Sequence, residues 1–175
     1  LNYKTIYYLG DINVKNNKHI SYQDYLYNNN IFGIDERFII NIDDHISYRY
    51  KIIDNLGKGS YGTVVKVEDC KYNKIKAIKI FNNFSAHTNE ENNKFFLKEL
   101  GILEMLYSRY NKSNKELFTL FYGENIFRNY NYIIFRLYNG NLYKERRKIL
   151  DSSIDNKIVI ITDLLNALLF LSCES

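Results

Sequence analysis

Residues 57–64 read Gly57-Lys58-Gly59-Ser60-Tyr61-Gly62-Thr63-Val64, and this run decides the fold of the 175-residue chain. It has a G-x-G-x-x-G-x-V pattern and lies between two segments with the composition of β-strands. Glycine lets the backbone turn tightly and bring its N–H groups close to a polyphosphate. A glycine-bearing hairpin without a ligand is the alternative for the run taken alone. A dinucleotide-binding turn would need a helix after the glycines, and a strand follows instead.

The segments around this run alternate between strand-like and helix-like spacing. β-Branched residues and turn residues predict strands over 50–56, 63–69, 76–81, 117–122 and 130–137, with a loop around residues 123–129. Phe96, Leu100, Leu103 and Tyr107 recur at a helical period and predict a helix over residues 89–109. The predicted fold class is α+β, with a five-stranded antiparallel sheet and one helix.

A further helix is predicted near the end of the sequence. Residues 154–171 carry apolar residues at helical spacing, namely Ile158, Ile161, Leu164, Leu165, Leu168 and Leu171. The sequence offers no evident partner for this apolar face. We therefore expect an isolated piece that exposes it to aggregate.

Lys79 ends the stretch Lys76-Ala77-Ile78-Lys79 in the third predicted strand. This stretch resembles the V-A-I-K pattern of protein kinases, with Lys76 in the place of valine. A lysine on a rigid strand is a compact cationic donor for the α- and β-phosphates of ATP. The short side chain of Ala77 leaves room for an adenine ring. The alternative for Lys79 is a solvated surface lysine, and the alternative for Ala77 is an alanine of the strand core.

Glu99 is the predicted partner of Lys79. A carboxylate on the helix over residues 89–109 would fix the ammonium group for phosphate binding, as the lysine–glutamate pair of kinases does. Glu90, Glu91 and Glu104 compete for this role, and an exposed helical glutamate is the alternative for each. Glu99 is favoured because Leu103, one turn later, stays on the apolar face of the helix.

The order of landmarks along the chain resembles the dual-specificity tyrosine-regulated protein kinases. The landmarks are residues 44–50 (DHISYRY), the glycine run, residues 127–130 (FRNY) and residues 141–143 (NLY). Residues 167–171 are similar to the family's helix before the catalytic loop, and the stretch up to Asp44 is similar to its accessory box. The resemblance implies an accessory region at 1–49, a kinase small lobe and hinge at 50–138, and the start of a truncated large lobe, with its first helices, at 139–175.

The resemblance also implies the residues of an ATP site. Leu56 and Val64 would lie above the adenine, Phe135 at the back of the pocket, and Asn141 near the ribose. The implied nucleotide-binding set is Leu56, Gly57, Lys58, Gly59, Ser60, Tyr61, Gly62, Val64, Ala77, Lys79, Phe135, Arg136, Tyr138 and Asn141. Strand core is the alternative for Ala77 and Phe135. The chain departs from the family at Lys76, at Arg136, where the family carries an acidic residue, and in the polar segment 84–93.

Composition argues against other classes of protein. The net charge of +4 is spread among acidic residues, so no basic stripe for nucleic acid is predicted. Apolar runs are too short for a membrane span. Two cysteines and no secretory pattern indicate a reducing compartment, cytoplasmic or nuclear. His19, His45 and His87 are too scattered for a zinc site, and no metal ligand is expected in this chain.

These observations predict an incomplete serine/threonine or dual-specificity protein kinase that uses ATP and Mg²⁺ and acts on protein hydroxyls. Lys79 and Glu99 are the predicted catalytic pair, and the chain is expected to be monomeric. The catalytic Asp and the metal-binding loops of kinases do not occur in the sequence, so this piece alone is expected to be inactive. The alternative is a pseudokinase or an ATP-binding regulatory module, which a downstream sequence without those aspartates would favour.

Overall fold

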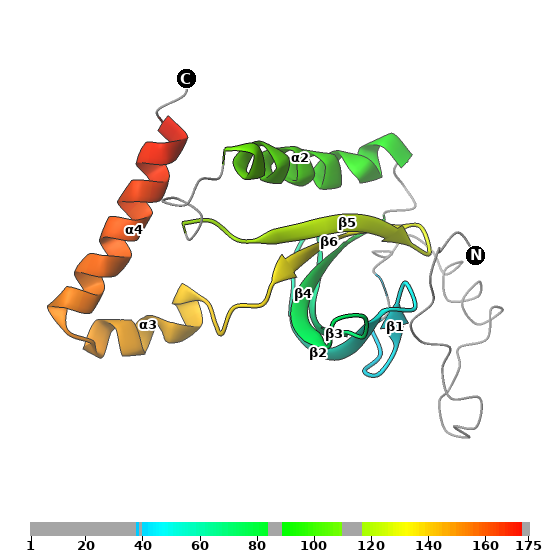
Figure 1. Cartoon of the computed structure of the whole chain (residues 1–175), viewed down its shortest axis with the longest axis horizontal. Coiled ribbons are helices and arrows are strands. Elements are labelled where there is room, and N and C mark those ends of the chain that lie inside the picture. The colour runs from blue at the N-terminus through cyan, green and yellow to red at the C-terminus, as the bar shows by residue number, and fades with distance from the viewer. Residues whose placement is uncertain (1–37, 39, 84–88, 110–116, 173–175) are drawn as a thin grey trace.

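The computed structural model describes residues 38, 40–83, 89–109 and 117–172 (Figure 1). The strands are β1 (His45–Ile46), β2 (Tyr50–Lys58), β3 (Gly62–Asp69), β4 (Lys74–Phe81), β5 (Phe121–Phe127) and β6 (Tyr130–Arg136). The helices are α2 (Asn89–Ser108), α3 (Leu142–Asp151) and α4 (Ile154–Ser172). The accessory region predicted before Asp44 lies almost entirely outside the described residues.

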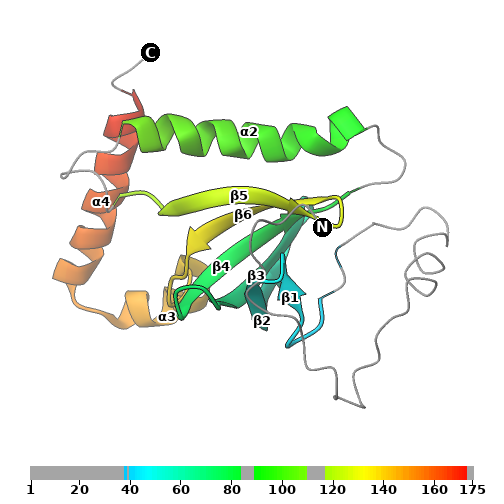
Figure 2. The same ribbon diagram turned by 45° about the vertical axis from the view of Figure 1, so that its right-hand side comes forward.

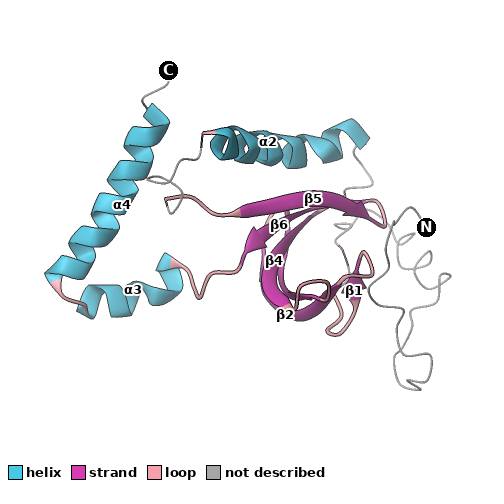
Figure 3. Cartoon of the chain, in the orientation of Figure 1, coloured by secondary structure: helices cyan, strands magenta, loops and turns pink. Residues whose placement is uncertain are grey.

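The described strands form one curled antiparallel sheet in the order β1-β2-β3-β4-β6-β5. Figure 3 shows the sheet beneath α2, with α3 and α4 beyond one end of β6. β3 alternates Val65 and Val67 inside the sheet with the more exposed Lys66 and Glu68, the pattern of a strand with one buried face. The predicted α+β class is confirmed, and β1 adds a two-residue strand to the five that were predicted.

The β5–β6 hairpin corrects the strand predicted at residues 117–122. β5 begins at Phe121 and runs through the segment predicted as a loop, so that Arg128 and Asn129 alone connect it to β6. Both connecting residues have positive φ, 52° and 66°, as a two-residue hairpin turn requires. Gly123, with φ of 135°, accompanies a register shift in β5. This irregularity interrupts the alternation that would have revealed the strand.

Two apolar clusters lie on opposite faces of the sheet. The inner face of the curl buries a cluster of Ile46, Tyr50, Ile52, Val65, Val67, Ile78, Ile80, Phe127, Tyr130, Tyr132 and Ile134. The outer face joins Phe81 and Ile133 to Phe96 and Leu103 of α2. Figures 1 and 2 show α2 lying across the sheet next to β5. The second cluster therefore fixes α2 to the sheet.

The helices after the sheet are more exposed. α3 lies in the segment where the resemblance implied the first helices of a large lobe, although no helical pattern was assigned to its own residues. Asn141 caps α3, because the Lys144 N–H donates to Asn141 Oδ1 at 2.8 Å. α4 matches the predicted helix, and in the described chain none of its side chains is buried. Phe170 of α4 contacts Phe118 at 5.3 Å between ring centroids. Among the described residues, no helix is long and apolar enough to cross a membrane.

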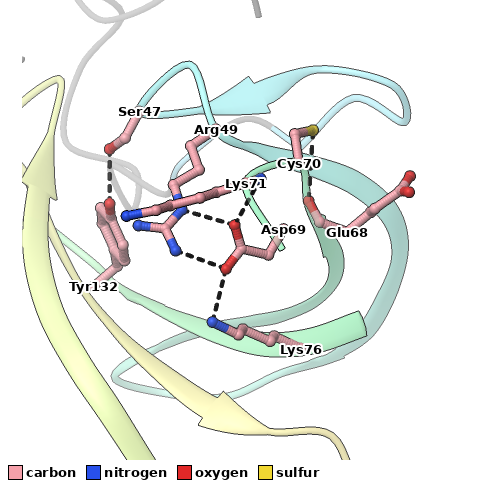
Figure 4. A network of polar contacts seen from close by, with 8 residues as sticks. All are labelled: Ser47, Arg49, Glu68, Asp69, Cys70, Lys71, Lys76 and Tyr132. Atoms are coloured by element: carbon pink, nitrogen blue, oxygen red, sulfur yellow. Dashed lines mark hydrogen bonds and ion pairs between the residues drawn. The ribbon is translucent and has the colours of Figure 1, made fainter. Parts of the chain in front are cut away.

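A buried charge network surrounds Asp69, the last residue of β3 (Figure 4). Asp69 is fully buried and accepts two 2.7 Å hydrogen bonds from the guanidinium of Arg49. Lys76 Nζ donates to the same carboxylate at 2.7 Å, and the Lys71 N–H donates at 3.1 Å. Lys76, which replaces the valine of the kinase pattern, therefore has a carboxylate partner inside the sheet.

Candidate nucleotide-binding site

The strand register gathers four predicted site residues on the outer face of the sheet. Val64 pairs with Lys79, and Ala77 pairs with Phe135. Directly opposed residues of antiparallel strands share a face, as do residues two apart on one strand. Val64, Ala77, Lys79 and Phe135 therefore lie on one face, which is also the face that α2 covers. Ala77 is buried and Val64 is half-buried.

Lys79 is joined to Glu99 across this face. Lys79 Nζ donates a hydrogen bond to Glu99 Oε2, and both side chains remain partly accessible. The strand–helix packing that creates the pair comes from Phe96 and Phe81, whose rings meet edge to face at 5.4 Å. Glu104, a competing candidate, lies on α2 but is exposed. The contact joins the two residues that the sequence paired, while their role in binding a nucleotide stays a prediction.

The glycine run forms the turn between β2 and β3. The Gly59 N–H donates to the Gly62 carbonyl at 2.8 Å and closes the turn. A Cβ added to Gly62 would lie 2.3 Å from the Ile80 carbonyl oxygen, so no larger residue fits there without a shift of backbone. A Cβ at Gly57 would meet nothing within 4 Å. Of these two glycines, Gly62 is the one that the packing requires.

The remaining predicted residues lie around the ends of these strands. Leu56, Lys58, Ser60 and Tyr61 are exposed along the β2–β3 connection. Arg136 ends β6, and its N–H donates to the Leu120 carbonyl at 2.9 Å. The Tyr138 hydroxyl accepts a hydrogen bond from the Leu120 N–H at 3.3 Å. Asn141 uses its side-chain oxygen as the cap of α3, so its contact with a ribose stays a prediction.

Three contacts near the site were not predicted. The ring of Tyr61 stacks on Phe95 of α2, with centroids 4.3 Å apart. Asn82 holds the glycine run from the end of β4. The ammonium group of Lys79 also lies 4.8 Å from the centroid of the Phe81 ring. Of the residues in these contacts, only Tyr61 could be singled out from the sequence, as the aromatic residue within the glycine run. Its partner Phe95 could not, because the two meet only in the tertiary structure.

A curled antiparallel sheet, a helix across it and a strand lysine paired with a helix glutamate define the small lobe of a protein-kinase fold. Comparison with solved structures finds this fold. A crystal structure of a kinase domain matches with a TM-score of 0.54 and 17% identity, covering 62% of this chain and 30% of that chain. No protein-family model matches the chain.

Relatives with curated descriptions narrow the class. The chain is 31% identical over 119 residues to the serine/threonine-protein kinase ppk15 of Schizosaccharomyces pombe, covering 68% of this chain and 20% of the relative. It is 38% identical over 108 residues to the human dual specificity tyrosine-phosphorylation-regulated kinase 4, covering 59% and 19%. The probable serine/threonine-protein kinase dyrk2 of Dictyostelium discoideum is 34% identical over 148 residues, covering 82% and 14%.

These matches confirm the resemblance predicted from the landmarks: the chain is similar to the dual-specificity tyrosine-regulated kinases and contains a kinase-like small lobe. The chain spans a fifth or less of the length of these three relatives. Among the described residues, no group of three or more His, Cys, Asp or Glu side chains is placed to hold a metal ion.

Proposed function

We propose that this chain is the ATP-binding part of a protein kinase that transfers the γ-phosphoryl group of ATP to hydroxyl groups of proteins. The observation that carries the proposal is the Lys79–Glu99 pair on the sheet face that also holds Val64, Ala77 and Phe135. Relatives named as serine/threonine and dual-specificity kinases support the same reaction class.

The residues present fit a nucleotide in two respects. The tight packing of Gly62 against β4 keeps the glycine turn close to the sheet, where its N–H groups can face phosphate oxygens. Lys79 supplies a positive charge on the same side of the sheet, and Glu99 limits the positions that its ammonium group can take. A bound ATP with Mg²⁺ would supply the phosphoryl group and neutralise its charge. The motifs with which kinases hold Mg²⁺ do not occur in this sequence.

In the proposed reaction the residues of this chain bind and orient. Lys79 would donate to the α- and β-phosphate oxygens, Glu99 would orient Lys79, and residues 57–62 would cover the phosphates. The half-buried Val64, with Ala77 and Phe135, would enclose the adenine between apolar surfaces. A hydrogen bond to a charged group contributes about 1.5–3 kcal/mol, so losing the Lys79 contact should lower kcat/KM about 10- to 100-fold.

The test is incorporation of labelled phosphate from ATP into a generic protein substrate by the full-length gene product. Lys79→Arg and Glu99→Gln are the test variants, and Lys74→Arg is the matched control, because Lys74 is an exposed lysine on the same strand. We expect activity in the wild type and the control and a 10- to 100-fold loss in the test variants. A folded wild-type protein that transfers no phosphate would refute the kinase proposal and favour a pseudokinase.

A further inference from the structure

The tip of the glycine run touches helix α2 through one aromatic pair. Tyr61 lies at the tip, and its ring stacks on Phe95 with centroids 4.3 Å apart and planes inclined by 32°. Both residues are exposed, Tyr61 to 51% and Phe95 to 38%. The contact therefore bridges two elements over an otherwise accessible surface, and it is not a part of either apolar cluster.

The backbone around Tyr61 is held by Asn82, the residue that follows β4. The Asn82 N–H donates to the Tyr61 carbonyl, and Asn82 Nδ2 donates to the Ser60 carbonyl, both at 3.0 Å. Asn82 is itself buried, which limits its movement. The turn is thus fixed to the end of the strand that carries Lys79, and the Tyr61 side chain extends from this fixed base to α2.

Phe95 is one helical turn before Glu99. Residues four apart on a helix lie on the same face. A contact that holds Phe95 therefore also restrains the rotation and approach of the turn that carries Glu99. The neighbouring Phe96 faces the sheet and packs on Phe81. α2 is consequently held at the sheet by Phe96 and at the glycine run by Phe95.

We propose that the Tyr61–Phe95 stack positions Glu99 against Lys79, so that the conformation of the glycine run and the position of α2 are coupled. Tyr61 is a positioning residue in this role, and it acts through its ring, not its hydroxyl group. The inference rests on the proposed function for its catalytic consequence. The coupling of the two elements can be measured without any activity.

The experiment compares the wild type with Tyr61→Ala, Phe95→Ala, the double variant and Tyr61→Phe in the full-length gene product. Leu97→Ala is the matched control, because Leu97 is an exposed apolar residue of the same helix. The first readout is hydrogen exchange of the α2 amides between residues 93 and 103. We expect each alanine variant to raise exchange about 2- to 10-fold, from the typical strength of aromatic pairs. Tyr61→Phe should retain the slow exchange, and Leu97→Ala should match the wild type.

The double variant separates coupling from two independent losses. If the rings act as a pair, the double variant exchanges no faster than either single variant, and its kcat falls no further. The loss should appear in kcat more than in KM, because misplacing Glu99 disturbs the phosphates and leaves the adenine contacts in place. Additive effects, or exchange and kcat unchanged in Tyr61→Ala, would overturn the inference.

Failure of this inference differs from failure of the proposed function. A wild-type protein that lacks phosphate transfer but shows the non-additive exchange pattern refutes the function and retains the coupling. An active wild-type protein with unaltered exchange and kinetics in the alanine variants refutes the coupling alone. If Phe95→Ala does not fold, Phe95→Leu replaces it, since leucine keeps an apolar side chain at this position of α2 but removes the ring.

Discussion

Removing the Asp69 carboxylate should destabilise the sheet far more than removing Lys76. Asp69 has a side chain with no exposed surface, and it is bonded to Arg49 and Lys76, which are 23% and 11% exposed. In Asp69→Ala both cations lose their shared partner inside the curl. Removing one partner of a buried ion pair costs about 3–5 kcal/mol, because the remaining charge is left uncompensated. We expect a loss of this size in the free energy of unfolding.

Lys76→Val provides the contrast. The carboxylate then keeps the two bonds from Arg49 and the one from the Lys71 N–H. One charge-assisted hydrogen bond is lost, but the cost of burying an ammonium group is also removed, and a valine adds apolar contact on the inner face. We expect a change under about 2 kcal/mol, which places the two variants at least about 1 kcal/mol apart.

The assay is urea unfolding followed by far-UV circular dichroism and tyrosine fluorescence, because the chain has no tryptophan. When the free energy of unfolding falls by about 2 kcal/mol per molar urea, a loss of about 3–5 kcal/mol lowers the urea concentration at the unfolding midpoint by roughly 2 M. Equal midpoint shifts in Asp69→Ala and Lys76→Val would refute the reasoning, since they would show that Asp69 is not the centre of the network.

The same network predicts a dependence on acid. Burial alone would raise the pKa of Asp69, but the hydrogen bonds from Arg49 and Lys76 outweigh it and hold the pKa below the ordinary value of 3.8. The folded state therefore binds fewer protons than the unfolded state in acid. This stabilisation is present above the unfolded pKa and is lost as the pH falls through the folded pKa. Asp69→Asn should flatten that loss, and an identical acid transition in the two proteins would contradict the prediction.

Two further predictions concern individual packing contacts. Gly62→Ala should destabilise the chain by about 1–3 kcal/mol and weaken binding of a fluorescent ATP analogue, because the added Cβ would meet the Ile80 carbonyl oxygen. Gly57→Ala is the control, because its Cβ would have open space. Equal melting temperatures for the two variants would contradict the prediction. Tyr132→Phe should lower the free energy of unfolding by about 0.5–1.5 kcal/mol, because the Tyr132 hydroxyl shares a 2.7 Å hydrogen bond with the buried Ser47 hydroxyl. Urea unfolding of Tyr132→Phe is compared with that of the exposed control Tyr143→Phe. Equal stabilities of the two variants would count against a role for the hydrogen bond.

Local pattern was sufficient for the regular elements and insufficient for the irregular ones. β3, β4 and α2 follow their periods closely, so the sequence predicted them within a few residues. β5 was misplaced because Gly123 breaks its alternation and because the connecting turn is only two residues long. No helical pattern was assigned to α3, because its residues 142–151 are mostly polar and its apolar residues lie only at its two ends, Leu142, Tyr143, Ile149 and Leu150.

The sequence likewise predicted one part of the candidate site and not the other. Lys79, Glu99 and the glycine run could be proposed from motif spacing, and the structure brings the first two into contact. The Tyr61–Phe95 stack and the partner of Lys76 could not be proposed, because both depend on elements that meet only in the folded chain. Asp69 precedes Lys76 by seven residues across the β3–β4 turn, and its burial depends on the curl of the whole sheet.

The two lysines of β4 show why the departure at position 76 is compatible with a nucleotide site at position 79. Residues three apart on a strand lie on opposite faces, so Lys76 faces the inside of the curl and pairs with Asp69, while Lys79 faces α2 and pairs with Glu99. Arg136, the departure in the hinge, is directly opposite Lys76 in the register. Both departures therefore lie in register on the face away from Ala77 and Phe135. Lys76 alters the charge inside the sheet, whereas Arg136, which the resemblance placed in the nucleotide-binding set, is exposed at the end of β6. Neither change replaces Val64, Ala77, Lys79 or Phe135 on the face that α2 covers.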